Sequence, residues 1–395
     1  MTSIKQAVIL AGGRGERLKP ITDTIPKPMV PINGKPFLEY LVELLKENGI
    51  EEIVMLLGYL PEKITEHFGD GSKFGVRIKY SIGAVEDETG TRIINAKDLL
   101  QNDFLLMYCD NYWPLRLGEL QRFHSDKNKA ATVTVYTNKQ GVTKNNVLVD
   151  SEGNVTLYDK SRTAAGLNGV DVGFFVLNKS VLKYAPDYNF NFEKEILPKL
   201  VAKKELAGYL TDHRYYSIGS PDRLPLTAEF LSDRKIVFLD RDGVINRKAP
   251  KADYVKTWGE FEFLPGSVEA IKLLTDSGYE IYVITNQPGI ARGMMTKEAL
   301  DEINGKMKEE LAKNGAEIRG IYQCLHGWDE GCDCRKPKPG LLYETAFEHN
   351  FDVTKAIFIG DDERDLQAGE AAGCRTILLA PGQTLLDVAK SLVRA

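Results

Sequence analysis

Long hydrophobic runs are missing from this sequence. No apolar stretch approaches the roughly 18 residues that a membrane-spanning helix requires. The first residues, MTSIKQAVILAGG, lead from an apolar run directly into glycines, where a secretory signal peptide would need a cleavage site. These absences predict a cytoplasmic protein without a membrane partner.

An excess of positive charge is also missing. The chain has 51 lysines and arginines against 56 aspartates and glutamates, a formal net charge of −5 at pH 7. Nucleic acids and anionic membranes bind proteins that offer many cations to their phosphates. We therefore expect no nucleic-acid partner, and any phosphate that this protein handles should belong to a small-molecule substrate.

Cysteine is scarce, and its distribution is uneven. Five cysteines occur in 395 residues, and three of them lie between Cys324 and Cys334. An odd number with this spacing does not form the disulfide framework of a small secreted protein. The clustering predicts a metal site instead.

The length and the patterning predict two α/β domains. Hydrophobic residues make up 43% of the 395 residues and charged residues 27%, which fits a folded chain longer than one typical domain. Apolar β-rich runs alternate with helical patterns, which is typical of doubly wound, mostly parallel sheets. This alternation restarts after Arg234 without a Gly/Ser-rich or Pro-rich linker. We expect a Rossmann-like domain over 1–232 and a second doubly wound domain over 233–395.

A glycine-rich turn follows the first expected strand, QAVILA. The turn GGRGERLKP places glycines where an open α/β sheet binds ligands, and backbone N–H groups there can approach a phosphate closely. The segment is neither a Walker loop nor a GxGxxG fingerprint, and a structural strand-to-helix turn would also explain it.

The longer segment LAGGRGERLKPITDTIPKPMVPI resembles the signature of the sugar-1-phosphate nucleotidyltransferases, over roughly residues 4–230. This family attaches a nucleoside monophosphate to a sugar phosphate and releases pyrophosphate. The resemblance implies that Arg17 and Lys27 hold the triphosphate and stabilise charge on the α-phosphoryl group, and that Asp110 binds Mg²⁺. The implied nucleotide-binding residues are Ala11, Gly12, Gly13, Gly15, Arg17 and Lys27. The implied sugar-phosphate residues are Lys160, Gly173 and Glu193.

Two positions depart from this family. Ser217 in YYSIGSPD stands where the family has a second metal-binding aspartate, so Mg²⁺ would rely on Asp110, phosphates and water. The segment GAVEDETGTR, residues 83–92, replaces the family stretch that lines the base pocket. The segment MYCDNYWP is most similar to the heptose 1-phosphate guanylyltransferases, which favours GTP as the donor.

The second domain opens with the segment FLDRDGVI, which resembles the D-x-D motif of the haloacid dehalogenase superfamily phosphatases. The resemblance implies that Asp240 is a nucleophile that forms an aspartyl-phosphate and that Asp242 is the general acid and base. Thr285 and Lys336 would bind the phosphoryl oxygens. Asp240, the carbonyl group of Asp242 and Asp361 would hold Mg²⁺.

The cysteine cluster belongs to the segment YQCLHGWDEGCDCRKP, directly before Lys336. Three thiolates and one imidazole in a C-x-H and C-x-C arrangement suit a structural, tetrahedral Zn²⁺. A zinc loop in this place resembles the heptose 1,7-bisphosphate and histidinol-phosphate phosphatases. In the former, the arginine that matches Arg335 places the phosphate that is not cleaved, and we include Asn286 among the expected substrate contacts. The expected zinc ligands are Cys324, His326, Cys332 and Cys334.

The two resemblances predict consecutive reactions on one sugar. The second domain would remove the 7-phosphate of heptose 1,7-bisphosphate with a minimal cap, and the first would couple the 1-phosphate, as the α-anomer, to a nucleotide. Mg²⁺ and Zn²⁺ are the expected metals, and sugar phosphates and nucleoside triphosphates are the expected partners.

Two other interpretations stay open at this point. The chain could be a hexose 1-phosphate nucleotidyltransferase fused to a broad sugar-phosphate phosphatase. Alternatively, Ser217 and the altered segment 83–92 could mark a nucleotide-binding domain that regulates the phosphatase without turnover.

Overall fold

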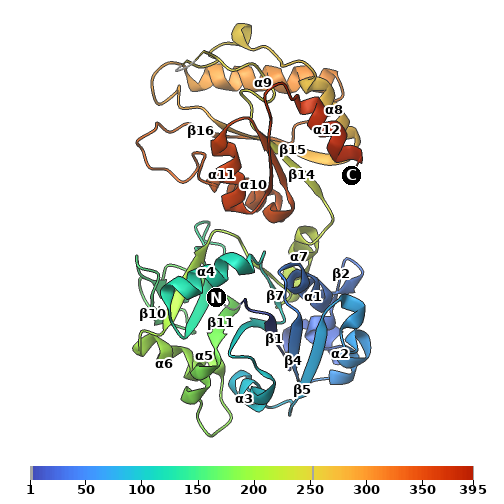
Figure 1. Ribbon diagram of the computed structural model, residues 1–395, viewed down its shortest axis with the longest axis vertical. Coiled ribbons are helices and arrows are strands. Elements are labelled where there is room, and N and C mark those ends of the chain that lie inside the picture. Colours follow the sequence, from blue (N-terminus) through green and yellow to red (C-terminus); the bar gives the residue numbers. More distant parts are fainter. Residues whose placement is uncertain (1–2, 251–252, 395) are drawn as a thin grey trace. The chain divides into compact units, whose positions relative to one another are not determined.

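The computed structural model describes residues 3–250 and 253–394, and the chain forms two compact units, Met1–Leu231 and Ser232–Ala395 (Figure 1). In the described part of the chain, no helix combines the length and the apolar character needed to cross a membrane.

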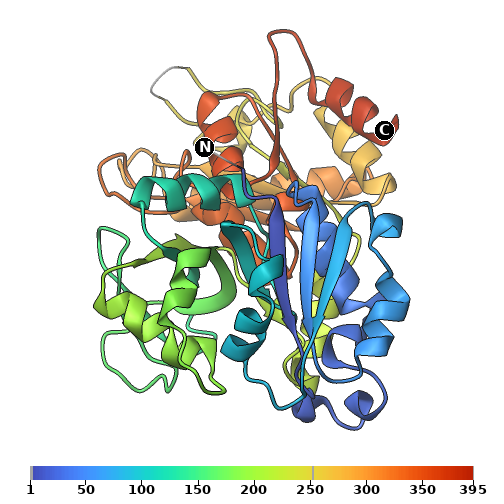
Figure 2. The ribbon, with the colours of Figure 1, turned by 60° about the horizontal axis from the view of Figure 1, so that its bottom comes forward.

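The first unit contains a seven-stranded sheet with the order β12-β8-β11-β6-β1-β4-β5. Its neighbouring strands run parallel except for β11, which is antiparallel to both β6 and β8. Figure 2 shows β1, β4 and β5 side by side. The expected mostly parallel sheet is confirmed. The strands are β1 Gln6–Ala11, β4 Glu52–Leu57, β5 Arg77–Ile82, β6 Asp103–Tyr108, β8 Ala131–Tyr136, β11 Val170–Asn178 and β12 Leu206–Thr211.

Helices cover both faces of this sheet because its central strands are apolar along almost their whole length, and successive residues point to opposite faces. In β1, Ala7 and Ile9 pack in one core, and Val8 and Leu10 pack in the other. The helices of the first core are α1 Phe37–Glu47, α2 Pro61–Phe68, α4 Leu117–Lys127 and α7 Leu224–Phe230. Those of the second core are α3 Thr89–Asn95, α5 Phe192–Glu195 and α6 Leu197–Ala202. Short strand pairs complete the unit: β2 Pro31–Ile32 with β3 Lys35–Pro36, β7 Asn111–Tyr112 with β13 Tyr216–Ser217, and β9 Val147–Val149 with β10 Val155–Tyr158.

The second unit has a five-stranded, fully parallel sheet with the order β16-β15-β14-β17-β18. Val237 and Leu239 of β14 face one core, whereas Ile236 and Phe238 face the other. The strands are β14 Lys235–Leu239, β15 Tyr279–Asn286, β16 Gly320–Cys324, β17 Ile357–Gly360 and β18 Arg375–Leu378. Helices α8 Ser267–Asp276, α9 Lys297–Lys313 and α12 Leu385–Arg394 cover the first core, and α10 Gly340–His349 and α11 Glu363–Ala372 cover the second.

In each sheet, successive strands are added first on one side of the first strand and then on its other side. In the first unit the change lies between β1 and β6, and in the second it lies between β14 and β17. Open α/β sheets bind ligands at the carboxyl ends of the strands at such points. The residues that follow these four strands therefore mark the two candidate sites.

Candidate active sites

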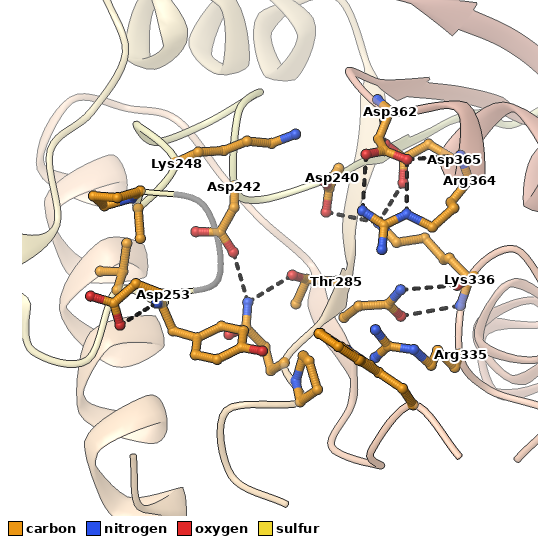
Figure 3. A pocket seen from close by; sticks show the side chains of 18 residues that line it. Asp240, Asp242, Lys248, Asp253, Thr285, Arg335, Lys336, Asp362, Arg364 and Asp365 are labelled. Atoms are coloured by element: carbon orange, nitrogen blue, oxygen red, sulfur yellow. Dashed lines mark hydrogen bonds and ion pairs between the residues drawn. The ribbon is translucent and has the colours of Figure 1, made fainter. Parts of the chain in front are cut away.

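The first candidate site lies in a pocket of the second unit, at the carboxyl ends of β14 and β15 (Figure 3). Asp240 follows β14, and its Oδ1 accepts a hydrogen bond from Lys336 Nζ at 2.8 Å. The same ammonium lies 2.6 Å from Asp365 Oδ1, and only 4% of the Lys336 side chain is exposed. One buried cation therefore sits between two carboxylates at the floor of the pocket.

Burial and the ion pair act in opposite directions on the pKa of Asp240 and on that of Lys336. Burial raises the pKa of Asp240 to about 7, although the Lys336 ammonium acts against that shift. Burial also disfavours the charged form of Lys336, but Asp240 and Asp365 outweigh it and raise the lysine pKa. Lys336 therefore stays cationic and favours an ionised Asp240.

Asp242 is held by three neighbouring side chains. Its carboxylate accepts hydrogen bonds from Gln287 Nε2 at 2.7 Å, from Arg241 Nη2 at 3.0 Å and from Asn246 Nδ2 at 2.9 Å. Gln287 Nε2 also donates to Thr285 Oγ1 at 2.9 Å, so one amide joins two of the predicted residues (Figure 3). Two carboxyl groups in such different surroundings can serve as nucleophile and proton carrier.

The carboxylates near β14 and β17 fit a divalent cation. Asp240, Asp361 and Asp365 each offer an oxygen within 4.8 Å of the others. Asp361 Oδ2 contacts Lys248 Nζ at 2.6 Å, while its Oδ1 is buried with no partner among the described residues. Carboxylate oxygens are the ligands that Mg²⁺ prefers, and an orphaned buried oxygen needs a cation or a donor.

Asp365 is a site residue that the sequence analysis missed. It lies in the first turn of α11, and its Oδ2 accepts the backbone N–H groups of Asp361 and Asp362 at 3.2 and 3.1 Å. It thus fixes the loop that carries Asp361 while its other oxygen contacts Lys336. The only signal in the sequence was its spacing of four residues from Asp361.

Arg335 and Asn286 both line the pocket, but they differ in what they can bind. Asn286 Oδ1 accepts from the backbone N–H of Lys336, and its Nδ2 donates to the Lys336 carbonyl, both at 3.1 Å. Its amide thus positions the Lys336 loop, while its second N–H and the second lone pair of Oδ1 stay available, so the substrate contact of Asn286 stays a prediction. Arg335 Nη1 is buried without a partner among the described residues, so it can still accept an anion.

An aromatic wall limits the pocket on another side. The Arg292 guanidinium lies 4.9 Å from the centre of the Trp328 ring and 5.7 Å from that of Tyr254, and its Nη1 donates to Tyr254 Oη at 2.9 Å. Tyr254 and Trp328 line the pocket, and 62% of Trp328 is exposed. The sequence analysis named none of these three residues, because they come from separate loops.

The cysteine and histidine cluster is assembled as expected. Cys324 Sγ lies 3.7 Å from Cys332 Sγ and 3.7 Å from His326 Nδ1, and His326 Nδ1 lies 3.2 Å from Cys334 Sγ. A tetrahedral zinc ion with bonds of about 2.3 Å to sulfur holds two sulfurs roughly 3.8 Å apart. All four ligand atoms lie within 4.8 Å of one another, so the donor set and its spacing fit zinc.

The second candidate site lies in the first unit, at the carboxyl ends of β1 and β6. The glycine-rich turn follows Ala11, and Gly15 has a φ of +67°. A Cβ atom at Gly15 would lie 2.8 Å from Lys27 Cβ, so the turn is folded against the segment that carries this lysine. Lys27 forms an ion pair with Asp110, which follows β6. The structure therefore brings the turn, Lys27 and Asp110 together.

Ser217 lies directly beside Asp110. It is paired with Asn111 in the β7–β13 ladder, and the N–H of the next residue, Ile218, donates to the Asp110 carbonyl at 3.0 Å. Arg223 Nη1 donates to Ser217 Oγ at 2.8 Å. The position of the family's second aspartate therefore carries a neutral hydroxyl with an arginine next to it. A Cβ atom at the adjacent Gly219 would lie 3.5 Å from Arg17 Nη2, which places Arg17 at this end of the site.

The expected sugar-phosphate residues gather around β10 and β11. Lys160 forms an ion pair with Glu193, and Gly173, with a φ of +83°, lies against Tyr108 and Asn111. Close to them lies a carboxyl group that the sequence analysis missed. Asp171 Oδ2 accepts a hydrogen bond from Tyr158 Oη at 2.8 Å, and burial, reinforced by Glu193, raises the pKa of Asp171 to about 7.

This raised pKa predicts a specific pH dependence of stability. Because folded Asp171 keeps its proton up to about pH 7 and the unfolded residue loses it near pH 4, its contribution to the free energy of unfolding falls as the pH rises between these values. Asp171→Asn should therefore flatten the fall in melting temperature between pH 5 and 8, measured by calorimetry. Asp126→Asn, on the exposed face of α4, is the control. Profiles of wild type and Asp171→Asn that run parallel would contradict the assignment.

Comparisons with known proteins cover both units. Residues 6–234 match the family model described as nucleotidyl transferase, and residues 333–393 match a HAD-hydrolase-like model. The D-glycero-beta-D-manno-heptose-1,7-bisphosphate 7-phosphatase of Pseudomonas aeruginosa is 40% identical over 159 residues, which are 40% of this chain and 88% of that protein. The phosphatase of the same name from Pseudomonas putida is 42% identical over 149 residues, 38% of this chain and 84% of that protein.

A solved structure resembles the first unit. The crystal structure of HddC from Yersinia pseudotuberculosis superposes with a TM-score of 0.50 at 26% identity, and it covers 57% of this chain and 99% of its own. The nucleotidyl transferase match spans more than half of the chain, and the phosphatase relatives are matched over most of their length. The chain therefore belongs to the nucleotidyl transferase family through its first unit and to the HAD-like heptose-bisphosphate phosphatases through its second.

Proposed function

We propose that this chain converts heptose 1,7-bisphosphate into a nucleotide-activated heptose in two steps, with GTP as the nucleotide donor. The observation that carries the proposal is the joining of both units in one chain. The second unit has an aspartate and lysine site and relatives named for heptose 1,7-bisphosphate, and the first resembles HddC of Yersinia pseudotuberculosis. The product of the first reaction is the substrate of the second.

The second unit would hydrolyse the 7-phosphate by covalent catalysis. Asp240 Oδ attacks phosphorus, and the bond to the sugar C7 oxygen breaks while Asp242 gives that oxygen a proton. Asp242 then removes a proton from water, which attacks the aspartyl-phosphate, releases phosphate and restores both carboxyl groups. Lys336 and Thr285 bind the phosphoryl oxygens throughout. Mg²⁺ bound by Asp240, Asp361 and the carbonyl of Asp242 would offset the negative charge gathered in the site.

Arg335 would hold the phosphate that is kept. Arg335 lines the same pocket as Asp240 and Lys336, and its buried Nη1 has no partner in the described part of the chain, so an anion there would satisfy it (Figure 3). A planar guanidinium can form paired hydrogen bonds with a phosphate, which fixes the sugar with one end at Arg335 and the other at Asp240. This arrangement explains how one phosphate is cleaved and the other retained.

The first unit would join the sugar 1-phosphate to the nucleotide. A phosphate oxygen of the sugar attacks the α-phosphorus in line, and the bond to the pyrophosphate oxygen breaks. Lys27 and Arg17 reduce the repulsion between the two anions and stabilise the charge that develops on the α-phosphoryl group. Asp110 would bind Mg²⁺ here, with phosphate oxygens and water in place of the carboxylate that Ser217 lacks.

The decisive experiment supplies the purified full chain with heptose 1,7-bisphosphate, GTP and Mg²⁺. We expect one phosphate and one pyrophosphate for each GDP-heptose, with phosphate appearing first. Parallel reactions use the α-anomer, which we expect to be the substrate, and the β-anomer, which the names of the phosphatase relatives specify. Phosphate release without a nucleotide sugar from any of the four nucleoside triphosphates would contradict the two-step function. Faster transfer to mannose 1-phosphate would contradict only the sugar assigned to the first unit.

A further inference from the structure

The altered segment 83–92 ends in a buried arginine that the proposed chemistry does not use. Arg92 lies in α3, and only 5% of it is exposed. Its guanidinium lies directly below the glycine-rich turn, because a Cβ atom at Gly12 would come within 2.2 Å of Arg92 Cζ. The Arg92 side chain therefore places a cation next to the predicted nucleotide site.

The guanidinium joins the carboxyl ends of three adjacent strands. Nη1 donates to the carbonyl of Leu57, the last residue of β4, at 2.7 Å. Nη2 donates to Ala84 and Val85, in the loop after β5, at 2.8 and 3.1 Å, and to Gly12, after β1, at 3.4 Å. A single side chain therefore fixes the paths of the three loops that leave these strands.

Glycines make room for this arrangement. A Cβ atom at Gly58 would lie 2.6 Å from both terminal nitrogens of Arg92 and 2.8 Å from the Gly12 carbonyl oxygen, so only glycine fits there. All four acceptors are backbone carbonyls, which carry partial charges only. The carboxylates of Asp87 and Glu86 also interact favourably with this guanidinium through their charges, so hydrogen bonds and neighbouring charges together hold Arg92 in place.

The residues just before Arg92 contact the chain next to the predicted sugar site. Glu88 N donates to Asn189 Oδ1 at 2.8 Å, and Asn191 Nδ2 donates to Glu88 Oε2 at 3.0 Å. Gly90 N donates to the Phe190 carbonyl at 3.0 Å. Hydrogen bonds therefore hold the segment both at the glycine-rich turn and at the residues that precede Glu193.

We propose that Arg92 is a positioning residue that holds the wall of the donor-nucleotide site formed by residues 84–88 and thereby sets the choice of base. This inference rests on the proposed nucleotidyl transfer. A site discriminates between bases only if the backbone groups that face the base are held in place, because a mobile wall can adapt to each of them. Lysine cannot replace Arg92, since a tetrahedral ammonium with three donors cannot reach four carbonyls on three loops.

The test compares wild type with Arg92→Lys and Arg92→Met. Equilibrium binding of each of the four nucleoside triphosphates is measured by calorimetry, and KM and kcat are measured for transfer. We expect the Kd and KM for the preferred triphosphate to rise at least about tenfold and the preference over the other three to fall by a similar factor. The KM for the sugar phosphate and the phosphatase rate of the second unit should change less than about twofold. Arg122→Lys, an exposed arginine of α4, is the matched control.

A second pair of variants covers the case in which loss of Arg92 prevents folding. Gly58→Ala leaves the arginine in place but pushes its guanidinium away from the carbonyls, whereas Gly118→Ala adds the same methyl group where only Arg122 lies nearby, at 3.9 Å. Gly58→Ala should reproduce the loss of base preference, and Gly118→Ala should not.

Two results would overturn the inference. The first is a folded variant, Arg92→Lys or Gly58→Ala, that binds the four triphosphates with wild-type affinities and preference. The second is an equal loss for nucleotide and sugar phosphate, which would make Arg92 a general structural residue. Because binding is measured without turnover, either result counts whether or not the chain transfers nucleotidyl groups.

Discussion

Asp240→Asn should lower the phosphatase rate of this chain by at least about 10³-fold while nucleotidyl transfer by the first unit continues at its normal rate. An amide has nearly the shape of the carboxylate but cannot form the aspartyl-phosphate. Asp240 is 7% exposed and lies 2.8 Å from Lys336 Nζ, so the substitution removes one of the two carboxylates that this ammonium contacts. Asp365 remains as its partner, and the variant should fold.

Single-turnover release of phosphate from heptose 1,7-bisphosphate is the measurement, with pyrophosphate release as the internal control of the same preparation. Asp276→Asn, which changes an exposed aspartate of α8, is the matched variant in the second unit. A phosphatase rate close to that of wild type would contradict the nucleophilic role of Asp240. A proportional loss of both activities would instead indicate damage to the whole chain.

Most of the fold could be predicted because its strands are short apolar runs that end in glycine or aspartate. The run QAVILA, which the pattern predicts as the first strand, is β1 with both ends as expected. The antiparallel direction of β11 could not be predicted, since VDVGFFVLN is buried along almost its whole length and its pattern is the same for either direction.

Site residues could be predicted only where a sequence motif indicates both the residue type and its chemical role. Asp240 and Lys336 come from motifs, and the structure brings them to hydrogen-bonding distance. Asp365 was missed because its role depends on the turn of α11 that aims one oxygen at Lys336. Asn286 has a role that its type did not reveal, because both ends of its amide bind the Lys336 backbone. Such contacts depend on how two loops meet in the fold, and no local sequence pattern predicts them.

Loss of the zinc site should destabilise the second unit and loosen its catalytic loop. We propose that Cys324, His326, Cys332 and Cys334 hold one structural Zn²⁺, since their ligand atoms lie within 4.8 Å of one another. The free energy of binding a structural zinc ion contributes to the free energy of unfolding. A loss of about 3 kcal/mol from the free energy of unfolding would lower the melting temperature of a unit of this size by roughly 6–12 °C. Cys332→Ser or chelation should produce this shift, and added zinc should reverse only the effect of chelation.

The same loss should raise the KM for the bisphosphate, because the zinc loop is continuous with the phosphatase site. Cys324 is paired in register with Asn286 at the ends of β16 and β15, and Asn286 holds the backbone of Lys336 through both ends of its amide. Trp328 lies between His326 and Cys332 in the sequence and stacks with Arg292 at the wall of the pocket. Without zinc, the four side chains are no longer tied together, and the loop that carries them becomes mobile. Arg335, which follows this loop, then cannot hold the retained phosphate in one place.

Tryptophan fluorescence reports on this coupling, with Trp328→Phe as the control that identifies the contribution of Trp328 among the three tryptophans of the chain. Chelation should change the emission of wild type but not that of Trp328→Phe, and the KM for the bisphosphate should rise over the same range of chelator concentration. Elemental analysis of protein purified without chelator should find about one zinc per chain. A zinc-free wild type with an unchanged melting temperature after chelation would exclude the site, and the four residues would then be three free thiols and an imidazole without a metal.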